Sequence, residues 1–295
     1  MRGRVCLVTG GSGGIGLATA KALKAQGATV HIVGRNREKL ARAARELDSV
    51  SFRADFASLA SVRELASALL ARDEPLHVLI NNAGIWLPDF QTTEDGFEQT
   101  FAVNHLAPYL LTRLLLPRLR ESGGDPRVVH VSSRLHLQAG QTGTPVGRAI
   151  HLLNVIGLRV GGAQARFEWD RLDRREGFRG LEAYARSKLA QILFSNELAR
   201  RQTDVSSNAV HPGSVATDVT RESAVLRLLE PLSRRILKTP AQGARTSVYV
   251  ASDPSLRGVS GRYFANAKRA TPASVVHDEA LGRELWELSA ERVGL

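Results

Sequence analysis

Short apolar runs rich in Val and Ile alternate along the chain with longer stretches of helical periodicity. The short runs predict buried strands at 4–9, 29–34, 50–55, 77–84, 127–133 and 205–213. The longer stretches predict helices at 16–27, 36–47, 59–71, 97–119 and 181–201. Because parallel strands need crossover connections, this alternation predicts an α/β fold, a doubly wound parallel sheet with helices on both faces. Ligands are expected at the carboxyl ends of the strands.

One stretch, 138–165, breaks this rhythm. Its Gly, Thr and Pro residues indicate turns, and mixed apolar residues follow them. The stretch is too long for an ordinary connection between elements and too apolar for a solvated linker. We interpret it as an insertion that packs over another part of a single domain spanning 1–295.

The segment TGGSGGIG at 9–16 lies between the first predicted strand and the first predicted helix. A turn without Cβ atoms lets the backbone approach a pyrophosphate, and the free N–H groups of the helix start supply an anion site. The glycines fit two spacings, G-x-G-x-x-G through Gly11, Gly13 and Gly16 and G-x-x-x-G-x-G through Gly10, Gly14 and Gly16. Either spacing implies a bound dinucleotide.

The same loop also contains G-x-S-x-G, through Gly10, Ser12 and Gly14, which is the pattern of a hydrolase nucleophile elbow. Three features weigh against a hydrolase: the loop follows the first strand, no HGGG-like oxyanion segment is present, and no convincing Asp and His pair follows. A P-loop is excluded because no Lys-Ser or Lys-Thr follows the glycines.

The end of the second predicted strand distinguishes NAD from NADP. A chain that prefers NAD has an acidic residue there to hold the ribose 2′-hydroxyl. This chain has Arg35 instead, with Arg37 as a possible assistant, and a guanidinium suits a 2′-phosphate. The sequence therefore predicts NADP(H) in preference to NAD(H); a solvated loop charge is the alternative for Arg35.

Tyr184 and Lys188 stand one helical turn apart in YARSK and project from the same face. The ordinary pKa of a phenol is near 10, so proton exchange at neutral pH requires neighbouring positive charge that favours the anion. Lys188 is suitably placed to supply it. By itself, the pentapeptide is equally compatible with an amphipathic helix that carries a snorkelling Lys.

Six motifs in order resemble the short-chain dehydrogenase/reductase family, and their local wording resembles its retinol dehydrogenase-like branch. They are TGxxxGIG from Thr9, NNAG at 81–84, the Asn at 104, VSS at 131–133, YARSK at 184–188 and HPGSVAT at 211–217. The resemblance implies a Rossmann-type fold and a catalytic tetrad of Asn104, Ser133, Tyr184 and Lys188.

The residue chemistry agrees with those roles. Ser133 is expected to donate to the substrate oxygen while Tyr184 gives or takes the proton. Because side chains alternate along a strand, only one of Ser132 and Ser133 can face the cleft, and the family pattern favours the second. Asn104 is expected to hold a water that passes protons to Lys188; a polar residue bonded within its own helix is the alternative.

The resemblance also implies a cofactor site along the strand ends. Asn82, Ala83 and Gly84 are expected beside the adenosine ribose, Asp55 at the adenine amine, and Pro212, Gly213 and Thr217 at the nicotinamide. The full predicted set is Gly10, Ser12, Gly13, Gly14, Ile15, Gly16, Arg35, Asp55, Asn82, Ala83, Gly84, Tyr184, Lys188, Pro212, Gly213 and Thr217. For Ile15, simple core packing is the alternative.

In one respect the chain departs from the family pattern: Ser133 and Tyr184 are 51 positions apart, much more than the family usually shows. The excess lies in 138–165. We expect this insertion, together with a segment at 214–238, to roof the substrate cleft. The Leu, Ile and Val content of both suits a lipophilic alcohol or carbonyl compound.

Composition narrows the remaining possibilities. The formal net charge of +11 comes mostly from Arg spread along the chain, and without a basic arm or aromatic-interleaved patch it does not predict a nucleic-acid partner. The single cysteine, Cys6, excludes an intrachain disulfide, and no apolar run is long enough to span a membrane. We expect a cytoplasmic protein without a metal, since the eight histidines lack ligand spacing.

Two functions remain after this reading. The first is an oxidoreductase that transfers hydride between NADP(H) and a small molecule. The second is a non-catalytic NADP-binding sensor or scaffold. Retention of all four tetrad residues favours the first. By analogy with the family, the helices near 97–119 and 184–201 are expected to form a homodimer or homotetramer.

Overall fold

Eight strands form one sheet in the computed structural model, which describes residues 1–140, 165–213, 215 and 238–295. The strand order is β3-β2-β1-β4-β5-β6-β7-β8, and every neighbouring pair is parallel except β7 with β8. The strands are β1 (Val5–Thr9), β2 (Thr29–Gly34), β3 (Ser51–Arg53), β4 (Val78–Asn81), β5 (Arg127–Val131), β6 (Ser206–His211), β7 (Arg262–Ala265) and β8 (Lys268–Arg269). The chain winds outward from β1 and then returns to β4 on its other side. This topology confirms the predicted doubly wound α/β fold.

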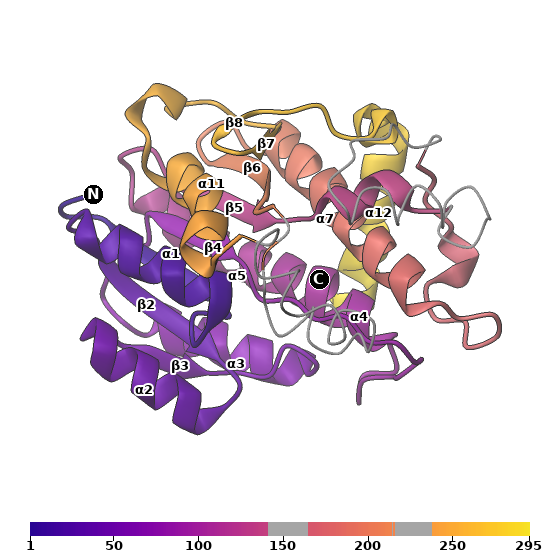
Figure 1. Cartoon of the computed structure of the whole chain (residues 1–295), viewed down its shortest axis with the longest axis horizontal. Helices are drawn as coiled ribbons and strands as arrows, with labels where there is room; N and C mark the ends of the chain where they lie inside the picture. Colours follow the sequence, from indigo (N-terminus) through magenta and orange to yellow (C-terminus); the bar gives the residue numbers. More distant parts are fainter. Residues whose placement is uncertain (141–164, 214, 216–237) are drawn as a thin grey trace.

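Helices cover both faces of the sheet (Figure 1). One face carries α1 (Gly14–Ala25), α2 (Arg37–Leu47) and α11 (Pro240–Ser252). The other carries α3 (Leu59–Leu70), α5 (Ala107–Glu121), α7 (Gly180–Arg201) and α12 (Glu279–Val293). Segments far apart in sequence become neighbours in this arrangement, because α11 lies against α1 and α12 against α7.

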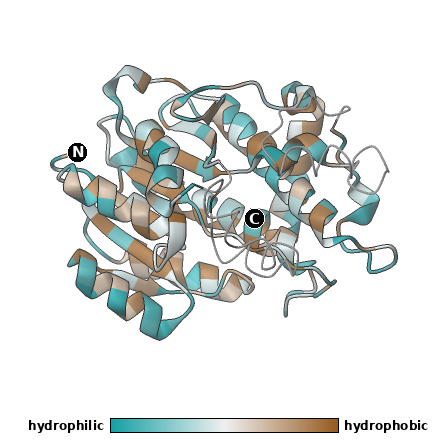
Figure 2. Cartoon of the chain, in the orientation of Figure 1, coloured by the Kyte–Doolittle hydropathy of each residue, from teal (hydrophilic) through white to brown (hydrophobic). Residues whose placement is uncertain are grey.

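The core explains why the strands read as continuous apolar runs. Along β1, Cys6 and Val8 pack into the cluster beneath α1 and α11, while Leu7 packs into the cluster on the opposite face. Strand side chains alternate between faces, so a sheet covered on both sides needs apolar residues at every position. Figure 2 shows the result: the strands are largely hydrophobic, and α2 at the edge is mostly hydrophilic.

Three strands end earlier than the predicted ends at 84, 133 and 213. β4 ends at Asn81, β5 at Val131 and β6 at His211, so the residues that follow each strand form loops at the carboxyl edge. The sequence pattern did not predict the C-terminal elements α11, β7, β8 and α12. β7 and β8 extend the sheet beyond β6, and the last pair turns back as a short antiparallel edge.

The predicted helix at 97–119 is interrupted. α4 (Gln99–Phe101) leads into the π turn η1 (Ala102–Leu106), and α5 follows directly. Glu98 caps the start, because its carboxylate accepts from the N–H groups of Thr100 and Phe101, both at 2.7 Å. Single π turns inside helices occur often at functional sites, and this one contains Asn104.

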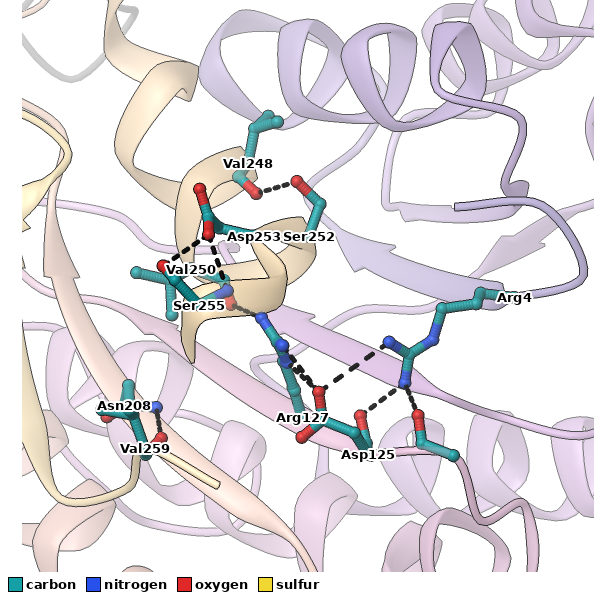
Figure 3. Close-up of polar contacts among 11 residues, drawn as sticks. Arg4, Asp125, Arg127, Asn208, Val248, Val250, Ser252, Asp253, Ser255 and Val259 are labelled. Atoms are coloured by element: carbon teal, nitrogen blue, oxygen red, sulfur yellow. Dashed lines mark hydrogen bonds and ion pairs between the residues drawn. The ribbon is translucent and has the colours of Figure 1, made fainter. Parts of the chain in front are cut away.

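An ion cluster around the buried Arg127 closes the opposite, amino edge of the sheet (Figure 3). Arg127 at the start of β5 donates to Asp125 Oδ2 at 2.6 and 2.8 Å and to the Val250 carbonyl at 2.9 Å. Arg4, just before β1, lies 4.0 Å from the same carboxylate. These charges tie β1, β5 and α11 together at the end of the strands away from the glycine loop, and their role is structural.

Short 3-10 turns connect several elements: η2 (Arg134–Gln138), η3 (Trp169–Arg171), η4 (Pro254–Leu256) and η5 (Ser274–His277). Most of the predicted insertion, and most of the 214–238 segment with Thr217, lie outside the described residues. The flanks of both segments are described, and each pair of flanks meets. Arg166 N donates to the Ala139 carbonyl at 2.9 Å, and Val215 forms a bridge with Lys238. None of the described helices is both long and apolar enough for a membrane crossing.

Candidate functional site

The glycine loop connects β1 to α1 through backbone conformations and close contacts that require glycine at several positions. Gly10 and Gly14 have φ values of +65° and +52°, which favour glycine. A Cβ on Gly16 would overlap the Gly10 carbonyl and lie 2.5 Å from Asn82 Nδ2. By contrast, no atom of the described residues beyond its chain neighbours lies within 4 Å of the position that a Cβ on Gly13 would occupy. The loop is therefore packed on one side and open on the other.

The amino end of α1 faces this open side without a side-chain cap. The helix begins at Gly14, the N-cap Gly13 has no side chain, and the first turn contains no acidic residue. The first N–H groups of a helix lack partners within it and carry partial positive charge. These residues therefore fit the pyrophosphate of a dinucleotide.

Asn82 and Thr9 hold the loop in place. Asn82 Nδ2 donates to the Thr9 carbonyl at 2.8 Å, and Thr9 Oγ1 accepts from the N–H groups of Asn82 and Ala83, both at 3.0 Å. The Asn82 side chain thus turns toward the glycine loop. Sequence analysis missed Thr9, although a Thr that ends a buried apolar strand is itself a signal of a partnered hydroxyl.

At the outer end of the loop, Arg35 follows β2 and its guanidinium lies 4.0 Å from the carboxylate of Asp55. Both side chains are exposed, at 66% and 45%, so this ion pair is weak and open to a ligand. Arg53 on β3 donates to the Arg35 carbonyl at 3.3 Å and brings a second guanidinium to the same edge. Ser12 lies between this edge and α1, against Gly34.

Ser133 and Tyr184 meet across the carboxyl edge of the sheet. Ser133 lies just beyond β5 in extended conformation, and its side chain lies close enough to the phenol of Tyr184 on α7 to lower the pKa of that phenol. Ser132 turns the other way, and its hydroxyl donates to the Lys188 carbonyl at 2.7 Å. Of the two serines, Ser133 is therefore the one whose hydroxyl lies at the tyrosine.

Lys188 extends from the next turn of α7. Its Nζ lies 5.5 Å from the centre of the Tyr184 ring and donates to the Val131 carbonyl at 3.0 Å and to Gln191 Oε1 at 3.1 Å. A Cβ on Gly84 would come within 3.2 Å of this nitrogen. The missing side chain at Gly84 lets the loop after β4 approach the lysine closely.

Asn104 joins that loop to α7. Its Oδ1 accepts from Ile85 N at 2.7 Å, and its Nδ2 donates to the Ile85 carbonyl and to Ser187 Oγ, both at 2.9 Å. The side chain of Asn104 is therefore hydrogen-bonded to protein groups and connects the loop after β4 to α7. Its backbone carbonyl accepts from Gln191 Nε2 at 2.7 Å, a contact that the sequence did not indicate.

Burial dominates the electrostatics of the pair. It raises the pKa of Tyr184 to about 12, against a smaller lowering by the hydrogen bond with Ser133. Burial also lowers the pKa of Lys188 to about 7. In the protein alone, the phenol is thus protonated at neutral pH and the lysine is close to its titration point, which differs from the lowered phenol pKa that the sequence reasoning favoured.

His136 supports Ser133 from behind. Its Nδ1 lies 2.6 Å from the Ser133 carbonyl, and its Nε2 accepts from Ala273 N at 3.1 Å. The bond to Nε2 requires the tautomer with hydrogen on Nδ1, which can then donate to the carbonyl. Burial lowers the pKa of His136 to about 4, so the ring is neutral at pH 7. No sequence motif indicated that His136 would support Ser133.

The remaining predicted residues lie along β6 and α1. His211 ends β6 and accepts from Arg134 N through Nδ1 at 3.2 Å; Pro212 and Gly213 follow it. Gly213 has a φ of +93° and packs against the side chain of Lys238. Ile15 lies near Gly243 in α11, which agrees with a packing role. No cluster of three or more His, Cys, Asp or Glu side chains suited to a metal occurs in the described part of the chain.

Known proteins resemble this chain over its whole length. The family model described as short chain dehydrogenase matches residues 4–146. Human retinol dehydrogenase 14 is 37% identical over 321 residues, which cover 100% of this chain and 88% of that protein. A solved structure from Mycobacterium paratuberculosis has a TM-score of 0.75 at 28% identity, covering 99% of this chain and 94% of the other. A short chain dehydrogenase from Burkholderia cenocepacia J2315 in complex with NADP has a TM-score of 0.65 at 26% identity, covering 90% and 96%.

Proposed function

The chain belongs to the short-chain dehydrogenase/reductase family, and from that premise we propose that it is an NADP(H)-dependent oxidoreductase that interconverts a carbonyl group and an alcohol. The observation that carries the proposal is the proximity of the Ser133 side chain to the phenol of Tyr184, with Lys188 one turn away. These three side chains lie at the carboxyl edge of the sheet, where the glycine loop and the uncapped end of α1 fit a dinucleotide.

A nicotinamide bound at this edge supplies the hydride in reduction and accepts it in oxidation. In reduction, Tyr184 would give its phenolic proton to the carbonyl oxygen. Ser133 donates a hydrogen bond to that oxygen and stabilises the charge that develops on it. In oxidation the same groups act in reverse, and the phenolate of Tyr184 takes the proton of the alcohol.

The raised pKa of Tyr184 favours the protonated form that reduction requires. Oxidation requires the phenolate, and positive charge nearby must offset the cost of burial. The ammonium of Lys188 supplies part of that charge at pH values below about 7, where it is protonated. The positive ring of an oxidised nicotinamide would supply the rest.

Two observations support NADP(H) over NAD(H). Arg35 and Arg53 bring two guanidinium groups to the outer end of the loop, where a chain that prefers NAD carries an acid. The short chain dehydrogenase from Burkholderia cenocepacia was solved with NADP. A 2′-phosphate would compete with Asp55 for Arg35, and the exposure of both side chains makes that exchange inexpensive.

We infer a lipophilic small-molecule substrate. Ile85, Trp86 and Leu87 are partly buried and directly follow Gly84, which lies near the nitrogen of Lys188. The related human protein is named for retinol, a lipophilic alcohol. The cytoplasm as location and a homodimer or homotetramer as assembly are retained as proposals; light scattering behind size exclusion tests the assembly.

The test is NADPH consumption at 340 nm with a panel of aldehydes, ketones and quinones, comparing the natural chain with Tyr184→Phe. We expect turnover to fall by about 10²-fold or more in the variant, the contribution of a positioned proton donor. Tyr249→Phe, which removes a phenol from α11, is the matched control and should retain full turnover. NADPH binding without turnover of any panel member would instead indicate a sensor or scaffold.

A further inference from the structure

Gln191 is a fully buried amide on α7, three residues after Lys188. Its Oε1 accepts from Lys188 Nζ at 3.1 Å, and its Nε2 donates to the Asn104 carbonyl at 2.7 Å. A buried amide is costly unless both its ends find partners, and here both ends do. One side chain therefore connects the lysine of the proposed site to the π turn η1.

The sequence leaves the Asn104 carbonyl without its usual helical hydrogen-bond donor. In an α-helix, that carbonyl would accept from the N–H of the residue four positions later. That residue is Pro108, which has no N–H. The proline and the π turn together release the carbonyl from the regular helical ladder, and Gln191 donates to it.

Lys188 has three ammonium hydrogens, and two of them are directed by protein acceptors. One points to the Val131 carbonyl and one to Gln191 Oε1. With these two fixed, the third direction is set, and the Nζ lies near the Tyr184 ring and the backbone of Gly84. The position of Gln191 therefore decides where the remaining donor of Lys188 points.

None of the titratable groups around Lys188 in the described part of the chain carries a negative charge that would stabilise its ammonium form. Tyr184 is protonated at pH 7. His105 on η1, His130 on β5 and His211 on β6 are buried with their pKa lowered to about 3, so all three are uncharged. Burial accounts for the lowered pKa of Lys188, and no carboxylate among the described residues offsets it. The hydrogen bonds that Lys188 donates to neutral acceptors are thus what favours its ammonium form.

We propose that Gln191 is a positioning residue for Lys188. The Gln191 side chain links the ammonium of Lys188 to the Asn104 carbonyl, and it thereby directs the remaining N–H donor of Lys188 toward Tyr184 and the nicotinamide ribose. The catalytic consequence rests on the proposed function. The contact itself does not, and it can be measured without substrate or cofactor.

The experiment is a pH titration of the cofactor-free protein grown with ε-13C-lysine. The chain has six lysines, so the spectrum is simple, and Lys188→Arg assigns the resonance. We expect the natural Lys188 to titrate near pH 7. Gln191→Met keeps the side-chain length but removes both polar ends and should lower that pKa by about 1. Gln191→Glu should raise it, because a carboxylate favours the ammonium.

Asn196→Leu is the matched control. Asn196 is also a buried amide on α7, and its Nδ2 donates to the Val276 carbonyl at 2.9 Å, away from the lysine. It should lower the melting temperature and leave the Lys188 titration unchanged. An unchanged titration in folded Gln191→Met, or an equal shift in Asn196→Leu, would overturn the proposal.

An activity measurement then separates the two proposals. With an alcohol that the natural protein oxidises, Gln191→Met should move the rising limb of the pH profile to higher pH, because less ammonium remains to favour the phenolate. If no panel compound reacts, the proposed function fails, and the titration still decides the role of Gln191. If compounds react but the titration is unmoved, only the positioning role fails.

Discussion

The side chain of Ser133 lies beside the phenol of Tyr184, although the two residues are 51 positions apart in the sequence. The serine lies just past a strand at the carboxyl edge of the sheet, and the tyrosine lies in the second turn of a helix that covers one face. The fold brings them together because parallel strands end at the same edge and α7 packs beside β6 and η2 there. Most of the sequence between the two residues belongs to the predicted insertion at 138–165. The two ends of this insertion are joined by the hydrogen bond from Arg166 N to the Ala139 carbonyl, so the insertion does not separate Ser133 from Tyr184.

Removal of this hydroxyl should impair the proton donor without damaging the fold. In Ser133→Ala, the pKa of Tyr184 should rise further, because the hydrogen bond that lowers it is lost. We expect kcat/KM to fall by about 10²-fold or more, with NADPH affinity unchanged. Steady-state kinetics across pH, with NADPH binding by fluorescence, checks this result.

Ser195→Ala is the control for that variant. Ser195 is a buried residue on the same helix as Tyr184, and its hydroxyl is hydrogen-bonded to Ser207 Oγ at 3.1 Å. The substitution therefore removes a buried hydroxyl and its hydrogen bond away from the site. It should cost stability and leave the pH profile intact. Equal losses of activity in the two variants would show that Ser133 matters only for packing.

Two glycines of the loop should separate folding from cofactor binding. Gly16→Ala places a Cβ against the Gly10 carbonyl and the Asn82 amide, so both the melting temperature and NADPH affinity should fall. Gly13→Ala, at an extended position, meets no other atom of the described part of the chain within 4 Å and should retain most of the stability. Its methyl group projects beside the uncapped helix end, so NADPH affinity should fall by about 10-fold or more. Tight NADPH binding by Gly13→Ala would mean that the phosphates pass elsewhere.

The fold could be predicted because both faces of the sheet are covered, which makes each strand a continuous apolar run. The same logic fails at the C-terminal side. α11 buries Gly243, Ala244, Thr246 and Ser247, small residues that allow close packing against α1 and leave no broad apolar stripe in the sequence. β7 has four residues and β8 two, which is too short for a recognisable pattern.

The site was predictable where its residues form contiguous motifs and unpredictable where they meet only in space. Tyr184 and Lys188 share a helix face, so their spacing alone brings them together. The contact between Gln191 and the Asn104 carbonyl depends on the packing of α7 against η1. Pro108, four residues after Asn104, was the available signal, because it removes one helical donor.

The outer end of the loop should determine cofactor choice. Arg35→Asp replaces the exposed guanidinium with the acid that holds a ribose 2′-hydroxyl in chains that prefer NAD. NADPH affinity should fall by about 10-fold or more through loss of a charge-assisted bond, and NADH affinity should rise. Titration calorimetry with both cofactors measures the change. If Arg35→Asp leaves the ratio of the NADPH and NADH affinities unchanged, Arg35 is a solvated charge. Arg37→Gln tests in the same way whether Arg37 contributes to NADPH binding.

Buried neutral histidines should make the protein sensitive to acid. His105 is fully buried among aromatic rings with Nε2 bonded to Ser289, and burial lowers its pKa to about 3. The unfolded chain binds a proton near pH 6.5 and the folded chain does not, so stability falls as the pH drops below about 6.5.

Between pH 7.5 and 5, this one group should cost about 2 kcal/mol of unfolding free energy. His105→Phe removes the titrating ring and keeps an aromatic packed against Phe101 and Phe194. Urea unfolding at both pH values should show a drop about 2 kcal/mol smaller in the variant than in the natural chain. His277→Gln, at an exposed position, should leave the natural drop unchanged. A variant whose stability fell in parallel with the natural protein would show that His105 takes up its proton without unfolding, because the aromatic cluster around it can open.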